Sequence, residues 1–254
     1  MDRTVRISAM GTALVLAAGV VVSIVTSTLV VSRSMEQRTR AMARARQDIT
    51  VKGSSRQRVL SDTAVWDIAV SGEAPTLEGA YGIIEESASR IRGFLTQKGF
   101  APGDVALSAI DTDTHYRRDG KGEPTREVSG YTLRRTFTVT SADCRKVDAA
   151  AAEVTALIKD GVKVASAQPR FYFSKLPDLK VQILGDAAKD ARGRADEIVK
   201  NAGGTVGPVR DAQMGVMQIT RPNSTETSGY GMYDTSTIEK DVTAVVTVTF
   251  GVEN

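Results

Sequence analysis

The sequence predicts an α+β fold, with helices packed on one face of a largely antiparallel sheet, preceded by a single N-terminal transmembrane helix. Three observations carry this prediction. Residues 7–32 form a run of Val, Leu, Ile and Ala without one charged side chain. Several later segments alternate apolar and polar residues with a period of two, which is typical of strands with one buried face. Between these segments, apolar residues recur in steps of three and four, which is typical of helices.

The uncharged run is long enough to cross a bilayer. At 1.5 Å per residue it would form a helix of about 39 Å, whereas the hydrocarbon core is about 30 Å thick. Such a run is too long for the apolar part of a signal peptide, so we expect residues 1–32 to be an uncleaved anchor. A cleaved signal that ends near Ala43–Arg44–Ala45 is the alternative. Residues 33–47 then form a basic stalk, and residues 48–254 form the folded body.

The charge distribution argues against a nucleic-acid partner. The whole chain has a net charge of +3, but residues 1–32 contribute +1 and residues 33–58 contribute +6, so residues 59–254 carry −4. A basic segment beside a membrane helix typically meets anionic lipid headgroups. We therefore expect the membrane, rather than nucleic acid, to be the partner of the basic segment.

The first half of the body predicts two strands, a helix and two further strands. ITVKG at 49–53 reads as a short strand, and residues 59–70 alternate. Thr76 is suited to cap a helix that Gly99 ends. Strands over 105–112 and 131–140 follow, with a polar loop at 117–130 between them. The residues expected to face the core are Ala64, Trp66, Ile68 and Val70, then Leu77, Tyr81, Ile84, Ala88, Ile91 and Leu95, then Leu133, Phe137 and Val139.

The second half predicts a similar order of elements. A helix capped by Ser141 and closed by Gly161 comes first, and an extended segment over 162–173 follows. A third helix after Pro177 is expected to bury Leu184, Ala188, Ala191, Ala195, Ile198 and Ala202. Gly185 and Gly193 within it suggest close packing against a sheet. A strand over 209–219, a polar loop at 221–237 and a strand over 242–250 complete the body, so two halves, 76–140 and 178–250, are loosely repeated.

No motif in the sequence predicts catalysis, a cofactor or a metal. Phosphate-binding loops, dinucleotide-binding glycine patterns and nucleophile elbows are all missing. His115 stands near Asp111 and Asp113 at a strand end, where an exposed surface position is the expected role. Cys144 is the one cysteine, and we expect a structural helix residue rather than a reactive thiol or an intermolecular bridge. We therefore predict a protein that is not an enzyme, with no catalytic, cofactor-binding or metal-binding residues.

Two function classes fit such a sequence. The first is an interaction protein that forms homo-oligomers by pairing exposed strand edges. The second is a small-ligand sensor or carrier with a site between the loops 117–130 and 221–237. In that case the pocket would be lined by Tyr116, Tyr230, Met232 and Tyr233.

Several segments of the body resemble the SIMPL-domain family of bacterial envelope proteins. They are ITVKG at 49–53, SDTAVWDIAV at 61–70, QKGFAPGD at 97–104, SGYTLRRTFTVTS at 129–141, DAAKDARGRADEIVKNAGGTVGPV at 186–209 and the strand at 242–250. The resemblance implies an envelope protein without established catalytic activity, in a family with members linked to oxidative-stress defence and members that assemble into rings. Gly193 and the uncleaved anchor depart from the family pattern.

The orientation of the anchor follows from two opposing indications. Five Arg residues follow the apolar run between Arg33 and Arg46, and two precede it, which by charge alone favours a cytoplasmic body. The family resemblance implies a periplasmic body. We give the resemblance more weight, because it extends over nearly the whole body, and expect a single-pass protein of the bacterial inner membrane with residues 48–254 in the periplasm.

Overall fold

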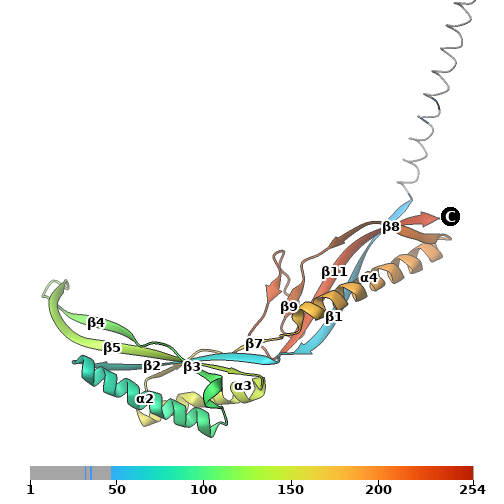
Figure 1. Cartoon of the computed structure of the whole chain (residues 1–254). Helices are drawn as coiled ribbons and strands as arrows, with labels where there is room; N and C mark the ends of the chain where they lie inside the picture. The colour runs from blue at the N-terminus through green and yellow to red at the C-terminus, as the bar shows by residue number, and fades with distance from the viewer. Residues whose placement is uncertain (1–31, 33–34, 36–46, 254) are drawn as a thin grey trace, which may run out of the picture. The chain divides into compact units, whose positions relative to one another are not determined.

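The computed structural model describes residues 32, 35 and 47–253 (Figure 1). The predicted anchor at 7–32 and the stalk at 33–47 fall almost entirely outside these residues. In the described part of the chain, no helix combines the length and the apolar character needed to cross a membrane.

Residues 47–253 contain eleven strands, three α-helices and two short 3-10 helices. The first half consists of β1 (Asp48–Leu60), β2 (Thr63–Ala74), α2 (Leu77–Gln97), η1 (Pro102–Asp104), β3 (Val105–Leu107), β4 (Asp111–Arg118) and β5 (Pro124–Ser141). The second half consists of α3 (Cys144–Glu153), η2 (Val154–Asp160), β6 (Val164–Ser166), β7 (Arg170–Tyr172), α4 (Leu176–Asn201), β8 (Thr205–Met214), β9 (Gln218–Thr220), β10 (Met232–Tyr233) and β11 (Glu239–Glu253).

The α+β class is confirmed, but the strands form two sheets rather than one. In the six-stranded sheet, β5 pairs antiparallel with β2 along eleven residue pairs and also with β3 and β4, while β2 pairs with β6 and β7. In the five-stranded sheet, β11 pairs with β1, β8 and β9, and β9 pairs parallel with β10. In each half of the chain, a helix is thus followed by a strand and a longer antiparallel partner.

The described residues form two compact units. The smaller unit comprises residues 47–53, 188–214 and 246–253, and the larger comprises 54–187 and 215–245. The smaller unit thus holds β8 and parts of β1, α4 and β11. The larger unit holds the whole six-stranded sheet together with α2 and α3.

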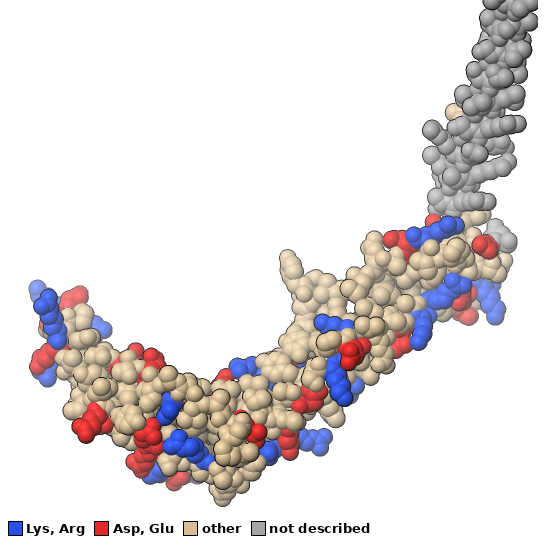
Figure 2. All heavy atoms as spheres, viewed as in Figure 1, with Lys and Arg blue, Asp and Glu red and all other residues tan. Residues whose placement is uncertain are grey.

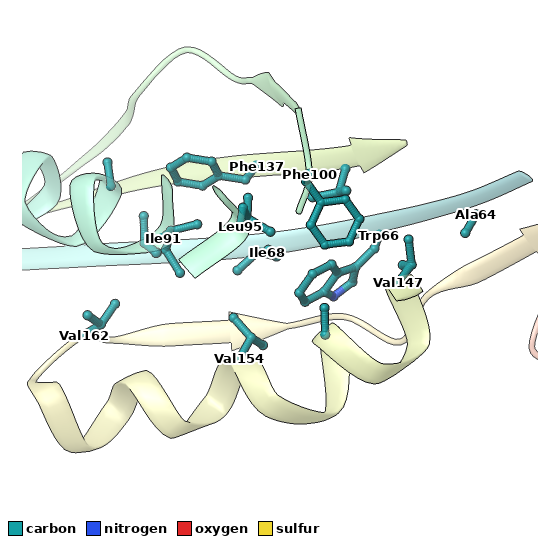
Figure 3. Packing of buried hydrophobic residues seen from close by; sticks show 14 of the residues in the cluster. Ala64, Trp66, Ile68, Ile91, Leu95, Phe100, Phe137, Val147, Val154 and Val162 are labelled. Atoms are coloured by element: carbon teal, nitrogen blue, oxygen red, sulfur yellow. The ribbon is translucent and has the colours of Figure 1, made fainter. Parts of the chain in front are cut away.

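The core of the larger unit lies between one face of the six-stranded sheet and the helices α2 and α3, which share that face (Figure 1). The alternation predicted for β2 and β5 is confirmed, because Ala64, Trp66, Ile68 and Val70 are buried together with Leu133, Phe137 and Val139. Trp66 belongs to this buried cluster together with Phe100 and Val147 (Figure 3). Its indole Nε1 donates a hydrogen bond to Ser166 Oγ at 2.9 Å.

Helix α2 begins as predicted, since Thr76 Oγ1 accepts a hydrogen bond from the Gly79 amide at 3.2 Å. The predicted core positions from Ile84 to Leu95 are buried. The prediction is wrong for Leu77 and Tyr81, which are 49% and 51% exposed. These two side chains border a groove, together with Ile110, Thr112 and Leu133, instead of packing into the buried core.

Close contact between α2 and the sheet depends on one glycine of β2. A Cβ atom at Gly72 would lie 2.8 Å from the carbonyl oxygen of Ala80, inside van der Waals contact. The prediction that Gly185 and Gly193 allow close packing is wrong. A Cβ atom at either position would meet no atom within 4 Å.

Three boundaries predicted for the first half need correction. The strand predicted at 49–53 continues to Leu60, where a break at Ser61 and Asp62 separates β1 from β2. The strand predicted at 105–112 is two strands, β3 and β4. Most of the polar loop predicted at 117–130 is strand, because β4 and β5 form a hairpin. Asp119 Oδ1 closes its turn by accepting the amides of Lys121 and Glu123 at 2.9 and 3.0 Å.

In the second half, the two helices differ from prediction in detail. The cap of α3 is Asp143, whose Oδ1 accepts the Lys146 amide at 2.9 Å, rather than Ser141. The buried residues of α4 recur every four positions instead of alternating between three and four. Four residues advance about 400° around a helix, so this buried stripe winds around α4 and departs from the straight stripe predicted. The buried residues are Leu179, Ile183, Ala187, Ala191, Ala195 and Val199.

Candidate interaction surface

Strand β4 is a free edge of the six-stranded sheet among the residues that the structure describes. It pairs with β5 on one side, and no described strand pairs with its other side. Every residue from Asp111 to Arg118 is exposed. An edge of this kind presents a row of unpaired N–H and C=O groups, which can pair with a strand of another chain.

The three polar residues singled out in the sequence all lie on this edge strand. The Asp113 carboxylate forms an ion pair with Arg134 of β5. His115 Nε2 lies 2.7 Å from Thr132 Oγ1. Within residues 32, 35 and 47–253, no three His, Cys, Asp or Glu side chains lie close enough to hold a metal ion. The cluster therefore consists of surface side chains that contact the neighbouring strand.

Charge is ordered along β4. The acidic residues Asp111 and Asp113 lie toward its start, and the basic residues Arg117 and Arg118 lie at its end. Arg117 contacts Glu127 of β5 at 3.3 Å, whereas no cation of the described chain lies within ion-pair distance of Asp111. Figure 2 shows basic and acidic side chains side by side on the far end of this hairpin.

An apolar groove of about 570 Å³ adjoins the edge strand. Leu77 and Tyr81 of α2 form one wall, and Thr112 of β4 lies on the other side. Thr112 is the register partner of the buried Leu133, so it lies on the face of the sheet that α2 covers. The groove residues are Leu77, Glu78, Tyr81, Ile110, Thr112 and Leu133.

The loops proposed to enclose a ligand belong to different sheets. Residues 117–130 form the end of the β4–β5 hairpin of the six-stranded sheet, and residues 221–237 carry β10 of the five-stranded sheet. Tyr116 is half exposed on β4 and Tyr230 is fully exposed, while Tyr233 stacks on Tyr172 with ring centroids 6.3 Å apart. Neither loop lines the apolar groove.

A buried polar cluster near the start of β11 has no counterpart in the sequence-based prediction. Lys240 is fully buried, and its Nζ donates hydrogen bonds to the carbonyl oxygens of Asp234 and Thr237, both at 2.7 Å. Burial lowers the pKa of Lys240. Burial also acts to raise the pKa of Asp234, but hydrogen bonds from Ser236 and the charge of Lys240 outweigh this and leave that pKa below its usual value. The cluster holds the segment 234–237 against the start of β11.

Asp241, the residue after Lys240, is also held by hydrogen bonds to a charged group. Arg58 Nε and Nη2 donate to the two carboxylate oxygens of Asp241 at 2.9 and 3.2 Å. These hydrogen bonds lower the pKa of the nearly buried Asp241. Lys240 lies two residues before Val242 and four before Ala244, on the same face of the strand. The alternation of buried residues at 242 and 244, extended by two residues toward the start of the strand, would therefore have predicted that Lys240 is buried.

Cys144 occupies a structural position. It is the first residue of α3, it is buried, and its Sγ donates to the Ser61 carbonyl oxygen at 3.3 Å. Burial raises the pKa of the thiol, and the charges of Asp62 and Asp143 add to the effect. The thiol therefore stays protonated at neutral pH, where the thiolate would be the reactive form.

Comparison with known proteins gives one strong match. The model of the family SIMPL, described as a protein of unknown function (DUF541), matches residues 49–250. None of the curated proteins compared with the chain matches it.

The similarities to solved structures are weak. A hydantoinase/carbamoylase family amidase from Burkholderia ambifaria aligns with 17% identity, a TM-score of 0.24, and coverage of 42% of this chain and 28% of the amidase. An amidase of that family from Burkholderia multivorans aligns with 14% identity and a TM-score of 0.25, and the alignment covers 49% of this chain and 29% of the amidase. The chain thus spans less than a third of each amidase. The designed protein Foldit4 aligns with 13% identity and a TM-score of 0.19, with coverage of 41% of this chain and 93% of the design.

Proposed function

Because the chain belongs to the SIMPL family, we propose that it is a non-catalytic protein of the bacterial cell envelope that assembles with copies of itself. In this proposal, residues 1–32 span the inner membrane and residues 33–47 contact anionic lipid. Residues 48–254 then lie in the periplasm. A role in defence against oxidative or envelope stress, which the family resemblance implies, is part of the same proposal.

The observation that carries self-assembly is the free edge of β4. A strand exposed over its whole length offers backbone hydrogen bonds to an incoming strand without any change in the fold. Most soluble oligomers are built from identical chains related by symmetry. A ligand-binding role has less support, because the loops proposed for it belong to different sheets.

Self-assembly predicts the mass of the purified protein. In mild detergent, the full-length chain should have at least twice the mass of one chain, measured by light scattering with the detergent contribution subtracted. A chain that stays monomeric up to high protein concentration would show that the proposed function is wrong. The variant Thr114→Pro should lower the mass, because proline removes one backbone donor and distorts the edge. Thr205→Pro, at the first residue of β8, is the matched control and should leave the mass unchanged.

The proposed orientation predicts the outcome of two fusions. Alkaline phosphatase fused after Asn254 should be active, because it folds with its disulfides only in the oxidising periplasm. A fluorescent protein that matures only in the cytoplasm should stay dark at the same position. Fluorescence together with an inactive phosphatase would place the body in the cytoplasm.

A further inference from the structure

The order of charges along β4 shows whether this edge strand repels a second copy or can pair with it. Charged side chains on an edge usually prevent pairing, since a second copy brings like charges together. On β4 the acidic residues Asp111 and Asp113 precede the basic residue Arg117. An antiparallel copy reverses this order and places acidic residues opposite basic ones. This edge is therefore complementary to itself.

Backbone geometry limits the registers of such a pair. Along β4, every second residue directs its N–H and C=O groups away from β5, and these groups are free to bond a second copy. In an antiparallel pair of two copies, each such residue must lie opposite another such residue, so the numbers of two opposed residues are both odd or both even. The two-fold axis therefore passes beside one residue and not between two. An axis at Asp113 brings two carboxylates together, which is unfavourable. An axis at Thr114 or His115 keeps opposite charges in contact.

The apolar groove selects between these two registers. With the axis at Thr114, Tyr116 of the second copy stands directly opposite Thr112, which lines the groove. Both residues lie on the sheet face that α2 covers, because their positions on β4 differ by four and the extra residue of the irregularity beside Tyr116, Ser129, belongs to β5. With the axis at His115, Arg118 of the second copy stands opposite Thr112 instead. Apart from Glu78 and Thr112, the groove is lined by Leu77, Tyr81, Ile110 and Leu133, and this mainly apolar lining favours an aromatic ring over a guanidinium.

We propose that two copies of this chain pair through β4 about a two-fold axis at Thr114, and that Tyr116 of each copy enters the groove of the other. Asp111 then faces Arg117 of the second copy, and Asp113 faces His115 of the second copy. The Arg117 guanidinium has five donors and binds Asp111 of the second copy while it contacts Glu127 of its own hairpin. The half-exposed Tyr116 becomes buried together with Leu77 and Tyr81, which explains why α2 leaves two large side chains uncovered.

This inference rests on the proposed self-assembly, and cysteine cross-linking tests its register. Residues on the axis have Cα atoms about 4.5 to 5.5 Å apart, within the range that a disulfide spans. The full-length variant Thr114→Cys in detergent should therefore form a covalent dimer under mild oxidation. His115→Cys is the matched control and should cross-link at least about tenfold more slowly, because its two Cα atoms are then diagonal neighbours about 7 Å apart. Wild type should give no dimer, since Cys144 is buried.

Reversing the charges of Asp111 and Arg117 is a second, independent test of the proposed β4 interface. Asp111→Arg and Arg117→Asp should each raise the dissociation constant at least about tenfold, because both ends of the dimer then bring like charges together. The double variant should restore association. All of these residues are exposed, so the circular dichroism of each variant should match that of wild type.

The outcomes separate this inference from the proposed function. Faster cross-linking of His115→Cys than of Thr114→Cys would overturn the register. An oligomeric mass without cross-linking of either variant would overturn the β4 interface but leave self-assembly intact. A monomeric mass would overturn both. Restoration by the double variant, together with cross-linking at Thr114, would establish the interface.

Discussion

Replacing Trp66 with alanine is expected to lower the free energy of unfolding of the larger unit by about 4 kcal/mol. The indole is fully buried between β2, α2 and α3, so its removal leaves a cavity lined by side chains from all three elements (Figure 3). Removal also leaves Ser166 Oγ without the indole N–H. An effect of this size is a large fraction of the stability of a typical domain.

Urea unfolding followed by far-UV circular dichroism measures this effect, because Trp66 is the one tryptophan and the variant loses the fluorescence signal. Trp66→Phe is the matched control. It keeps most of the apolar volume and should cost about 1–2 kcal/mol, mainly through the lost hydrogen bond. If Trp66→Ala lowered the free energy of unfolding no more than Trp66→Phe does, the packing of the indole would not be a main contribution to the stability of the core.

Replacing Lys240 with methionine is expected to cost about 3 kcal/mol of stability. Methionine fills similar space but has no donor, so the carbonyl oxygens of Asp234 and Thr237 lose their hydrogen bonds in a buried environment. The Asp234 carboxylate also loses a cation at 3.9 Å. Removing a buried charge offsets part of this cost but leaves its partners unsatisfied.

Tryptophan fluorescence can follow the unfolding of this variant, since Trp66 is retained. Lys180→Met is the control, because Lys180 is exposed on α4 and its replacement should change stability by less than about 0.5 kcal/mol. Equal stabilities for the two variants would mean that the hydrogen bonds of Lys240 contribute nothing to the fold.

The sequence allowed prediction of the parts of the fold that depend on a single repeating pattern. The alternation in β2 and β5 identified their buried faces, because one face of each strand is covered by helices along most of its length. Gly99 and Thr76 marked the ends of α2, since caps act through neighbouring backbone groups.

The candidate interaction surface depends on contacts between distant residues, which local patterns do not encode. Leu77 and Tyr81 continue the apolar stripe of α2, and periodicity cannot show that the adjoining layer leaves a groove there. Whether β4 is an edge depends on which strands adjoin β5, not on its own residues. For the same reason, the polar segment 117–130 was interpreted as a loop, although pairing with β5 makes it a hairpin.

The pairing of β1 with β11 also bears on the rate of folding. It joins the first and last strands of the described chain, and the hydrogen-bonded side chains of Thr50 and Thr249 are 199 residues apart in sequence. Contacts of such high sequence separation form slowly, because the entropy of closing the intervening loop must be lost first. During synthesis, every other strand leaves the ribosome before β11, the strand to which β1, β8 and β9 all pair. Until β11 arrives, those three strands have no common partner, and the nascent chain exposes their unpaired edges to aggregation or to chaperones.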